Sequence, residues 1–222
     1  MIKALVFDFD GLIVDTESTD FQAWQEVGLQ YNVDLTLETW LPVVGRGFTT
    51  QIFDPYEYLL AQSKESLDYK IVRTQCGERN LALIEQQPIL PGVERLIAEA
   101  KERGLGLAVA SSSKREWVAG HLERLELLQH FDALACGDEV LHTKPYPDLY
   151  LAAIEKLGIK ASEAIAFEDS RNGMLAAREA GIFCVVIPNL MTQSLSFDEA
   201  SFRLFSLAEK SLDELVALTE NA

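Results

Sequence analysis

The sequence lacks most of the features that mark secreted, membrane-spanning or disulfide-rich proteins. Its three cysteines stand far apart and form no CxxC pair, which argues against a disulfide framework and against a zinc site. No apolar run approaches the ~20 residues that a membrane-spanning helix needs, and the apolar start at residues 1–7 is too short for the core of a signal peptide. We therefore expect a cytoplasmic protein without a membrane partner, in which the cysteines are buried thiols.

Positive charge is also scarce. The chain has 19 Lys and Arg residues against 35 Asp and Glu residues, which gives a formal net charge of -16 at pH 7. Non-specific nucleic-acid binding needs a basic face, so we expect no nucleic-acid partner. The same acidic excess would repel an anionic substrate at long range. A site for such a substrate must therefore concentrate positive charge locally, for example from a divalent metal and one or two lysines.

The pattern of apolar residues divides the chain into two parts. Residues 2–9, IKALVFDF, predict a strand buried on both faces, which is typical of a parallel sheet. Residues 17–87 show helical spacing without a strand-like run, so they predict an all-helical insertion. After Pro88 the pattern alternates between helices and strands. The expected helices are 93–103, 116–128, 147–157, 172–180 and 207–218, and the expected strands are 105–110, 133–136, 164–167 and 183–187.

This alternation predicts an α/β fold, a doubly wound, Rossmann-like parallel sheet with right-handed crossovers. The predicted catalytic core comprises residues 1–16 and 88–222, and the predicted helical cap domain comprises residues 17–87. In open parallel sheets, ligands bind at the carboxyl ends of the strands. Chemically active residues follow four of the predicted strands: Asp8, Asp10 and Gly11, then Ser111 to Lys114, then Lys144, then Glu168 to Ser170.

These residue types fit phosphoryl transfer. A carboxylate at position 8 can act as a nucleophile, and Asp10 can protonate the leaving oxygen and then activate water. The chain must begin to turn at Asp10 for both side chains to serve one site, and Gly11 permits that turn. Together with Glu168 and Asp169 they form four clustered carboxylates, which predict a hard cation, Mg²⁺. Ser111 can donate to phosphoryl oxygens, and Lys144 supplies positive charge.

Each motif alone also has an ordinary structural explanation. The DxDG sequence can be a simple turn, Ser113 is a candidate helix N-cap, and the EDS sequence at 168–170 is a plausible N-cap before the next helix. The occurrence of all four motifs at strand ends, in order, favours a functional site over four unrelated loops.

The sequence resembles the haloacid dehalogenase-like hydrolase superfamily in FDFDGLIVDTE, LAVASSSK, TKPYPDLY and AFEDSRNG. The resemblance is to the branch with a helical cap after the first strand, which includes phosphoglycolate phosphatases and beta-phosphoglucomutase-like proteins. It implies Asp8 as nucleophile and Asp10 as acid and base. It also implies Lys144 as the lysine of the third motif, and Asp169 with Glu168 as metal ligands alongside Asp8 and the backbone carbonyl of Asp10. The metal-free dehalogenases lack the second aspartate, which is present here.

Two alternatives to a phosphatase stay open. Beta-phosphoglucomutases resemble the chain around Asp15 and Thr16 and around residues 21–24, but they carry a cap histidine where this sequence has Asp20. This difference favours hydrolysis over a mutase. The third hypothesis is a non-catalytic binding protein on the same fold, which the presence of both Asp8 and Asp10 disfavours.

Substrate contacts are expected from the core and from the cap. We assign Ser111, Ser112 and Lys114 to substrate binding from the core, and Arg46, in a predicted loop of the cap, as a candidate for the distal end of the substrate. Closure of the cap over the site would exclude water from the first step. The expected substrate is a small phosphorylated metabolite, and a monomer is the expected oligomeric state.

Overall fold

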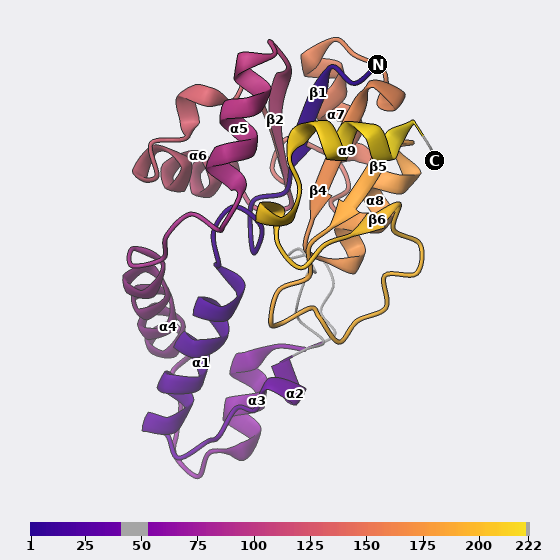
Figure 1. Ribbon diagram of the computed structural model, residues 1–222. Helices are drawn as coiled ribbons and strands as arrows, with labels where there is room; N and C mark the ends of the chain where they lie inside the picture. Colours follow the sequence, from indigo (N-terminus) through magenta and orange to yellow (C-terminus); the bar gives the residue numbers. More distant parts are fainter. Residues whose placement is uncertain (41–52, 221–222) are drawn as a thin grey trace.

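The computed structural model describes residues 1–40 and 53–220. Its centre is a six-stranded sheet in the order β3-β2-β1-β4-β5-β6, in which every paired strand is parallel (Figure 1). The predicted doubly wound parallel sheet is therefore confirmed. The strands are β1 (Ala4–Phe7), β2 (Gly106–Ser111), β3 (Ala133–Cys136), β4 (Ala164–Glu168), β5 (Phe183–Val186) and β6 (Phe202–Arg203).

Helices cover the two faces of the sheet, which differ in the size of their side chains. One face presents large residues such as Phe7, Val109 and Phe167 to α5 (Val93–Glu102), α6 (Arg115–Arg124) and α9 (Leu212–Thr219). The other face is rich in alanine, and it packs against α7 (Asp148–Leu157) and α8 (Arg171–Glu179). Small side chains allow these two helices to approach the sheet closely. The alanines of this face are Ala108, Ala110, Ala133, Ala135, Ala164 and Ala166.

The structure differs from the expected elements mainly at helix ends. The helix expected at 116–128 ends at Arg124, because Glu126 adopts a positive φ of 57° and a short 3₁₀ turn follows at Leu128–His130. The helix expected at 207–218 is split. Leu207–Glu209 forms a 3₁₀ turn, and α9 starts afresh where the Ser211 side chain accepts from the backbone of Glu214. Strand β6 has two residues, too few to give a sequence pattern.

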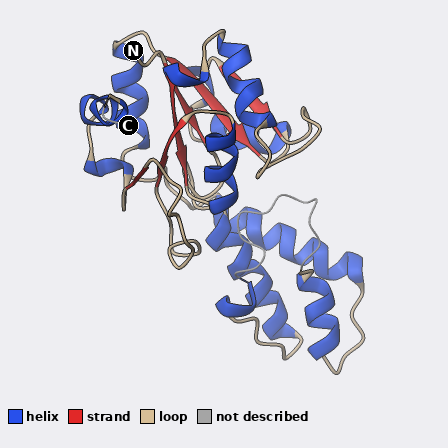
Figure 2. Ribbon diagram, turned by 90° about the vertical axis from the view of Figure 1, so that its right-hand side faces the viewer, coloured by secondary structure: helices blue, strands red, loops and turns tan. Residues whose placement is uncertain are grey.

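A separate bundle of helices lies on one side of the sheet domain (Figure 2). The described part of this cap comprises α1 (Glu17–Gln30), α2 (Leu37–Trp40), α3 (Pro55–Gln62) and α4 (Tyr69–Ile84). Its own core contains Trp24, Trp40 and Leu59. Pro55 is the first residue of α3, where its missing N–H is tolerated. The exact division of the chain at residues 16/17 and 87/88 stays a prediction.

Two expectations concern the chain as a whole. Cys76, Cys136 and Cys184 are buried and free, as predicted. Among the helices of the described residues, none is both long and apolar enough to cross a membrane.

Candidate active site

The site begins at the end of the central strand. In β1, Phe7 pairs with Val109 of β2 on one side and with Phe167 of β4 on the other. The backbone N–H of Asp8 donates to the Phe167 carbonyl at 2.9 Å, so the ladder continues one residue past the strand. Asp8 is 6% exposed. The fold therefore presents the Asp8 carboxylate at the centre of the carboxyl edge of the sheet, where ligands of parallel sheets bind.

Lys144 lies between two carboxylates. Its Nζ is 2.6 Å from Asp8 Oδ1 and 2.6 Å from Glu168 Oε1, and all three side chains are buried. Burial alone would lower the pKa of Lys144, but the charges of Asp8 and Glu168 outweigh it and raise that pKa above its usual value. Lys144 therefore stays protonated and places a positive charge beside Asp8.

Glu168 is the most enclosed of the acids. Its Oε1 also accepts from the Tyr150 hydroxyl at 2.5 Å, and its Oε2 accepts from Ser170 at 3.3 Å. The carboxylate lies against Gly173 of α8 so closely that a Cβ at that position would overlap it. Glycine at 173 thus makes room for Glu168. Hydrogen bonds therefore hold both oxygens of Glu168, and Oε1 also pairs with Lys144.

A group of buried carboxylates could hold a metal ion. Oxygen atoms of Asp8, Glu168 and Asp169 all lie within 4.8 Å of one another. Burial, followed by the charge of Glu168, raises the pKa of Asp8 to about 8, although Lys144 opposes the shift. Burial and the charge of Asp8 raise the pKa of Asp169 well above its usual value. One lysine among three buried carboxylates leaves negative charge uncompensated, which is the environment that suits a divalent cation with oxygen ligands.

Asp10 is held differently from Asp8, by hydroxyl and indole donors. Thr16 Oγ1 and Trp117 Nε1 donate to Asp10 Oδ1 at 2.8 and 3.0 Å, while Ser111 and Ser113 donate to Oδ2 at 3.2 and 2.6 Å. The chain turns directly after Asp10, where Gly11 has a φ of 78°. The predicted turn is therefore present. The Asp10 side chain points toward β2 and α6, from which Ser111 and Trp117 donate to it.

The residues after β2 occupy varied positions. Ser111 is fully buried and contacts Asp10. Ser112 Oγ is buried and has no hydrogen-bond partner among the described residues. Ser113 is not the N-cap of the next helix. That position belongs to Lys114, whose side chain makes no capping bond, and the Ser113 hydroxyl donates to Asp10 instead.

Lys114 is exposed, and Arg46 lies outside the described residues. Ser170 caps α8, as the sequence allowed.

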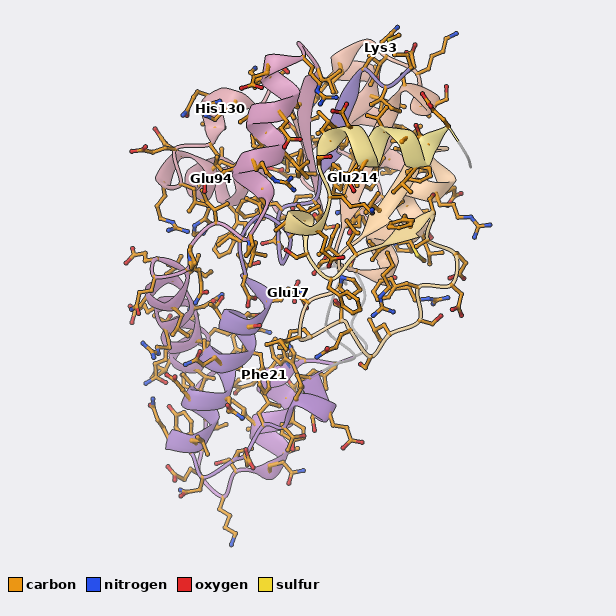
Figure 3. The ribbon with its side chains drawn as sticks, viewed as in Figure 1. Lys3, Glu17, Phe21, Glu94, His130 and Glu214 are labelled. Carbon is orange, nitrogen blue, oxygen red and sulfur yellow. The ribbon has the colours of Figure 1, made fainter. Side chains whose placement is uncertain are left out.

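Several residues of the site were missed by the sequence analysis. The core contributes Tyr150, Trp117 and Asn189 to this group. Asn189 Nδ2 donates to Asp169 Oδ2 at 2.7 Å. From the cap, Glu17 begins α1 and lies between the two parts of the molecule (Figure 3). Burial and the charge of Asp10 raise the pKa of Glu17 well above its usual value. Figure 3 places Glu17 at the end of α1 that lies nearest the sheet domain.

Comparison with known proteins agrees with this geometry. The haloacid dehalogenase-like hydrolase family matches residues 5–187. The chain is 42% identical over 212 residues to "Putative phosphatase YhcW" of Bacillus subtilis, which covers 96% of this chain and 95% of the relative. It is 31% identical to CbbY of Rhodobacter sphaeroides, solved in complex with xylulose-(1,5)bisphosphate, with a TM-score of 0.72 and coverage of 94% and 96%. A "putative beta-phosphoglucomutase" of Thermotoga maritima gives a TM-score of 0.81 at 25% identity over the full length of both chains.

The parallel sheet, the inserted helices and the carboxylates at the strand ends define an α/β protein with a candidate ligand site at the carboxyl edge of its sheet. This chain belongs to the haloacid dehalogenase-like hydrolases. The predicted enzyme class, a phosphoric monoester hydrolase of this family, is confirmed.

Proposed function

We propose that this protein is a Mg²⁺-dependent phosphatase that hydrolyses small phosphorylated metabolites, sugar phosphates foremost, through an aspartyl-phosphate on Asp8. The observation that carries the proposal is the Asp8 carboxylate. Its Oδ1 is held by Lys144 at 2.6 Å, and its Oδ2 has no hydrogen bond from the described residues. A carboxylate anchored through one oxygen can present the other to phosphorus.

The metal would be held by Asp8, Asp169 and the backbone carbonyl of Asp10, with Glu168 as a further acid beside it. The buried oxygens within 4.8 Å of one another fit Mg²⁺, which prefers hard oxygen ligands. When bound, the ion neutralises charge on the phosphoryl oxygens and orients them. Lys144 adds a fixed positive charge beside Asp8 Oδ1.

The chemistry of the chain's own residues then runs in two steps. In the first, Asp8 Oδ2 bonds to phosphorus, the bond from phosphorus to the substrate oxygen breaks, and Asp10 gives that oxygen a proton. In the second, Asp10 takes a proton from a water molecule as the water oxygen bonds to phosphorus. The bond between phosphorus and Asp8 breaks, and inorganic phosphate leaves. Trp117 and Thr16 hold Asp10 in position, while Ser111 exchanges its bond to Asp10 for a phosphoryl oxygen.

The substrate class is inferred from the relatives and from the cap. CbbY binds a sugar bisphosphate in its complex, and the relatives include proteins named as phosphatases of hexitols. The proposed cap, residues 17–87, would cover the site, with Glu17 toward the leaving group. Arg46, which lies outside the described residues, stays a candidate from the sequence for binding the distal end of the substrate. Ser112 and Lys114 are proposed to contact the substrate from the core side.

A mutase is the second candidate, because the full-length structural similarity to a beta-phosphoglucomutase supports it. Against it stands Asp20, a carboxyl group in place of the cap histidine of mutases. The test is phosphate release by the purified protein with Mg²⁺ across a panel of phosphorylated metabolites that includes beta-glucose 1-phosphate, with product identification.

Phosphate release that disappears in Asp8→Asn supports the phosphatase. Conversion of beta-glucose 1-phosphate to the 6-phosphate with little free phosphate would make the protein a mutase. Absence of turnover of every substrate, with phosphorylated ligands still bound, would favour the binding protein.

A further inference from the structure

Asn189 lies at the carboxyl edge of the sheet, in the segment that follows β5. Its side-chain amide nitrogen Nδ2 donates to Asp169 Oδ2 at 2.7 Å and lies 3.4 Å from the Gly11 carbonyl oxygen. Both acceptors belong to the proposed active site, because Asp169 is a proposed metal ligand and Gly11 follows Asp10. A side-chain bond from an outer residue fixes the orientation of a ligand before the metal arrives.

The carbonyl oxygen of the same amide accepts hydrogen bonds from its own turn. Asn189 Oδ1 accepts from the backbone N–H groups of Met191 and Thr192 at 2.9 and 3.1 Å. Thr192, which is fully buried, also accepts from the Asn189 backbone N–H at 3.0 Å. If the amide were rotated by 180°, its oxygen would face two acceptors and its nitrogen would face two donors. The neighbours of Asn189 therefore fix the orientation of its side chain. Asn189 is therefore not free to ligate a metal through Oδ1.

The close approach of these groups also depends on Gly11. A Cβ at position 11 would collide with Asp169 Oδ2 and would lie 2.7 Å from Asn189 Nδ2. The glycine thus serves two purposes. It permits the positive φ of the turn after Asp10, and it leaves space for the hydrogen bond between Asn189 and Asp169.

Two residues after Asn189, the segment enters the cap. Met191 is 3% exposed, and it belongs to the hydrophobic cluster of the cap together with Trp24, Trp40 and Leu59. In Figure 1 the loop that follows β5 runs from the sheet toward the cap helices. Leu190, between Asn189 and Met191, is 72% exposed. In this short turn of the sheet domain, the Asn189 side chain therefore bonds to Asp169, while the Met191 side chain packs in the hydrophobic cluster of the cap.

We propose that Asn189 is a positioning residue that orients Asp169 for the metal, and that Met191 ties this metal site to the cap. The proposal rests on the proposed metal site. Asn189 acts through its hydrogen bond and touches no reacting atom. Because Met191 packs in the cap while Asn189 holds Asp169, displacement of the cap would disturb the turn and loosen Asp169.

The test measures Mg²⁺ binding directly, by isothermal titration calorimetry of the full-length protein without substrate. Asn189→Ala is expected to weaken Mg²⁺ binding by about 10- to 100-fold, the range found when outer hydrogen-bond partners of metal ligands are removed. Met191→Ala keeps the side chain of Asn189 but removes the anchor in the cap, so it is expected to weaken binding by a smaller factor. Leu190→Ala is the matched control in the same turn, and it should bind Mg²⁺ as the wild type does.

The outcomes separate the two proposals. Wild-type affinity in Asn189→Ala overturns the positioning role, and Met191→Ala with the affinity of Leu190→Ala overturns the tie to the cap. If the wild type itself binds no Mg²⁺, the proposed metal site fails and this inference fails with it. If Asn189→Ala does not fold, Asn189→Ser decides. Its hydroxyl can still accept from the turn, but it is too short to reach Asp169.

Discussion

Lys144 Nζ lies 2.6 Å from Asp8 Oδ1, although 136 positions separate the two residues in the chain. Glu168 holds the same ammonium group at 2.6 Å from its other side. The three charges are almost completely excluded from solvent. Removing one partner of a buried ion pair leaves the other charge unpaired, which costs more than the pair itself contributes. Lys144 therefore contributes to stability as well as to the proposed chemistry.

This arrangement predicts that Lys144→Met destabilises the protein. The variant leaves Asp8, Glu168 and Asp169 together without their cation, which should cost about 3–5 kcal/mol at pH 8 in the absence of metal. Urea unfolding of the variant and the wild type at pH 8 with EDTA measures the loss. A variant as stable as the wild type would contradict the electrostatic explanation.

Asp8→Asn tests the nucleophile. The amide oxygen can still accept from Lys144, and Glu168 still pairs with it, so the fold should survive. Phosphate release should fall by at least about 10³-fold, in line with the loss caused by removing a catalytic nucleophile. Phosphate assays with Mg²⁺, together with circular dichroism, check both statements. Appreciable turnover in the folded variant would exclude an aspartyl-phosphate on Asp8.

Metal removal should abolish activity and lower stability. A ligand present at 100 times its dissociation constant stabilises the folded state by about 2.7 kcal/mol, which for a chain of this size raises the Tm by roughly 5–10 °C. Asp169→Asn should lose most of this Mg²⁺-induced rise. Glu94→Gln, an exposed acid in the first turn of α5 (Figure 3), should keep it. Full activity in excess EDTA would contradict the metal assignment.

The sequence predicted the part of the site that depends on topology. Asp8, Lys144 and Asp169 follow strands of a parallel sheet, and parallel strands end at one edge, so their proximity could be inferred without coordinates. The strand-end rule, applied to the strand expected at 183–187, would also have indicated Asn189. Trp117 could not be found in this way. Its helical spacing predicted that it lies on an apolar face. Such spacing carries no information about the hydrogen bond from Trp117 Nε1 to Asp10.

Tertiary contacts, which the sequence pattern does not show, also explain the errors in the predicted helix ends. Whether a helix stops at Arg124 or runs to residue 128 is a small difference in free energy, and tertiary packing decides it. The orientation of the Ser113 hydroxyl, toward Asp10 instead of a helix N-terminus, depends on where α6 begins. That helix starts one residue later than a Ser113 cap would require.

Trp117→Phe should lower the rate and leave binding largely intact. The substitution keeps an aromatic ring beside His121, whose ring lies 4.3 Å from the Trp117 ring in an edge contact, but it removes the Nε1 donor to Asp10. Loss of one of several hydrogen bonds that orient a catalytic acid corresponds to about 1 kcal/mol, so kcat should fall about fivefold with little change in KM. Steady-state kinetics decides between this result and a structural role. A variant in which only KM rises would place Trp117 at the substrate instead.

Asp20 should make stability depend on pH between about 4 and 6. Burial raises the pKa of Asp20 from its ordinary value to about 6; Arg73 opposes that shift and Asp10 adds to it. Its Oδ1 also lies 3.4 Å from Asn80 Nδ2. Between the unfolded and folded pKa values, the folded state binds more protons than the unfolded chain. The contribution of Asp20 is therefore most favourable below pH 4 and is lost as the pH rises through 6, by at most about 3 kcal/mol.

Asp20→Asn removes this proton uptake. Relative to the wild type, the variant should therefore gain stability steadily from pH 4 to pH 6 and keep a constant advantage above pH 6.5. Asp34→Asn, which changes an exposed acid of the cap, is the matched control and should show no such trend. Tm measured every half pH unit for the three proteins, with EDTA throughout to keep metal binding out of the comparison, gives the curve. A difference between Asp20→Asn and wild type that stays flat from pH 4 to pH 7 would show that Asp20 titrates at its ordinary pKa.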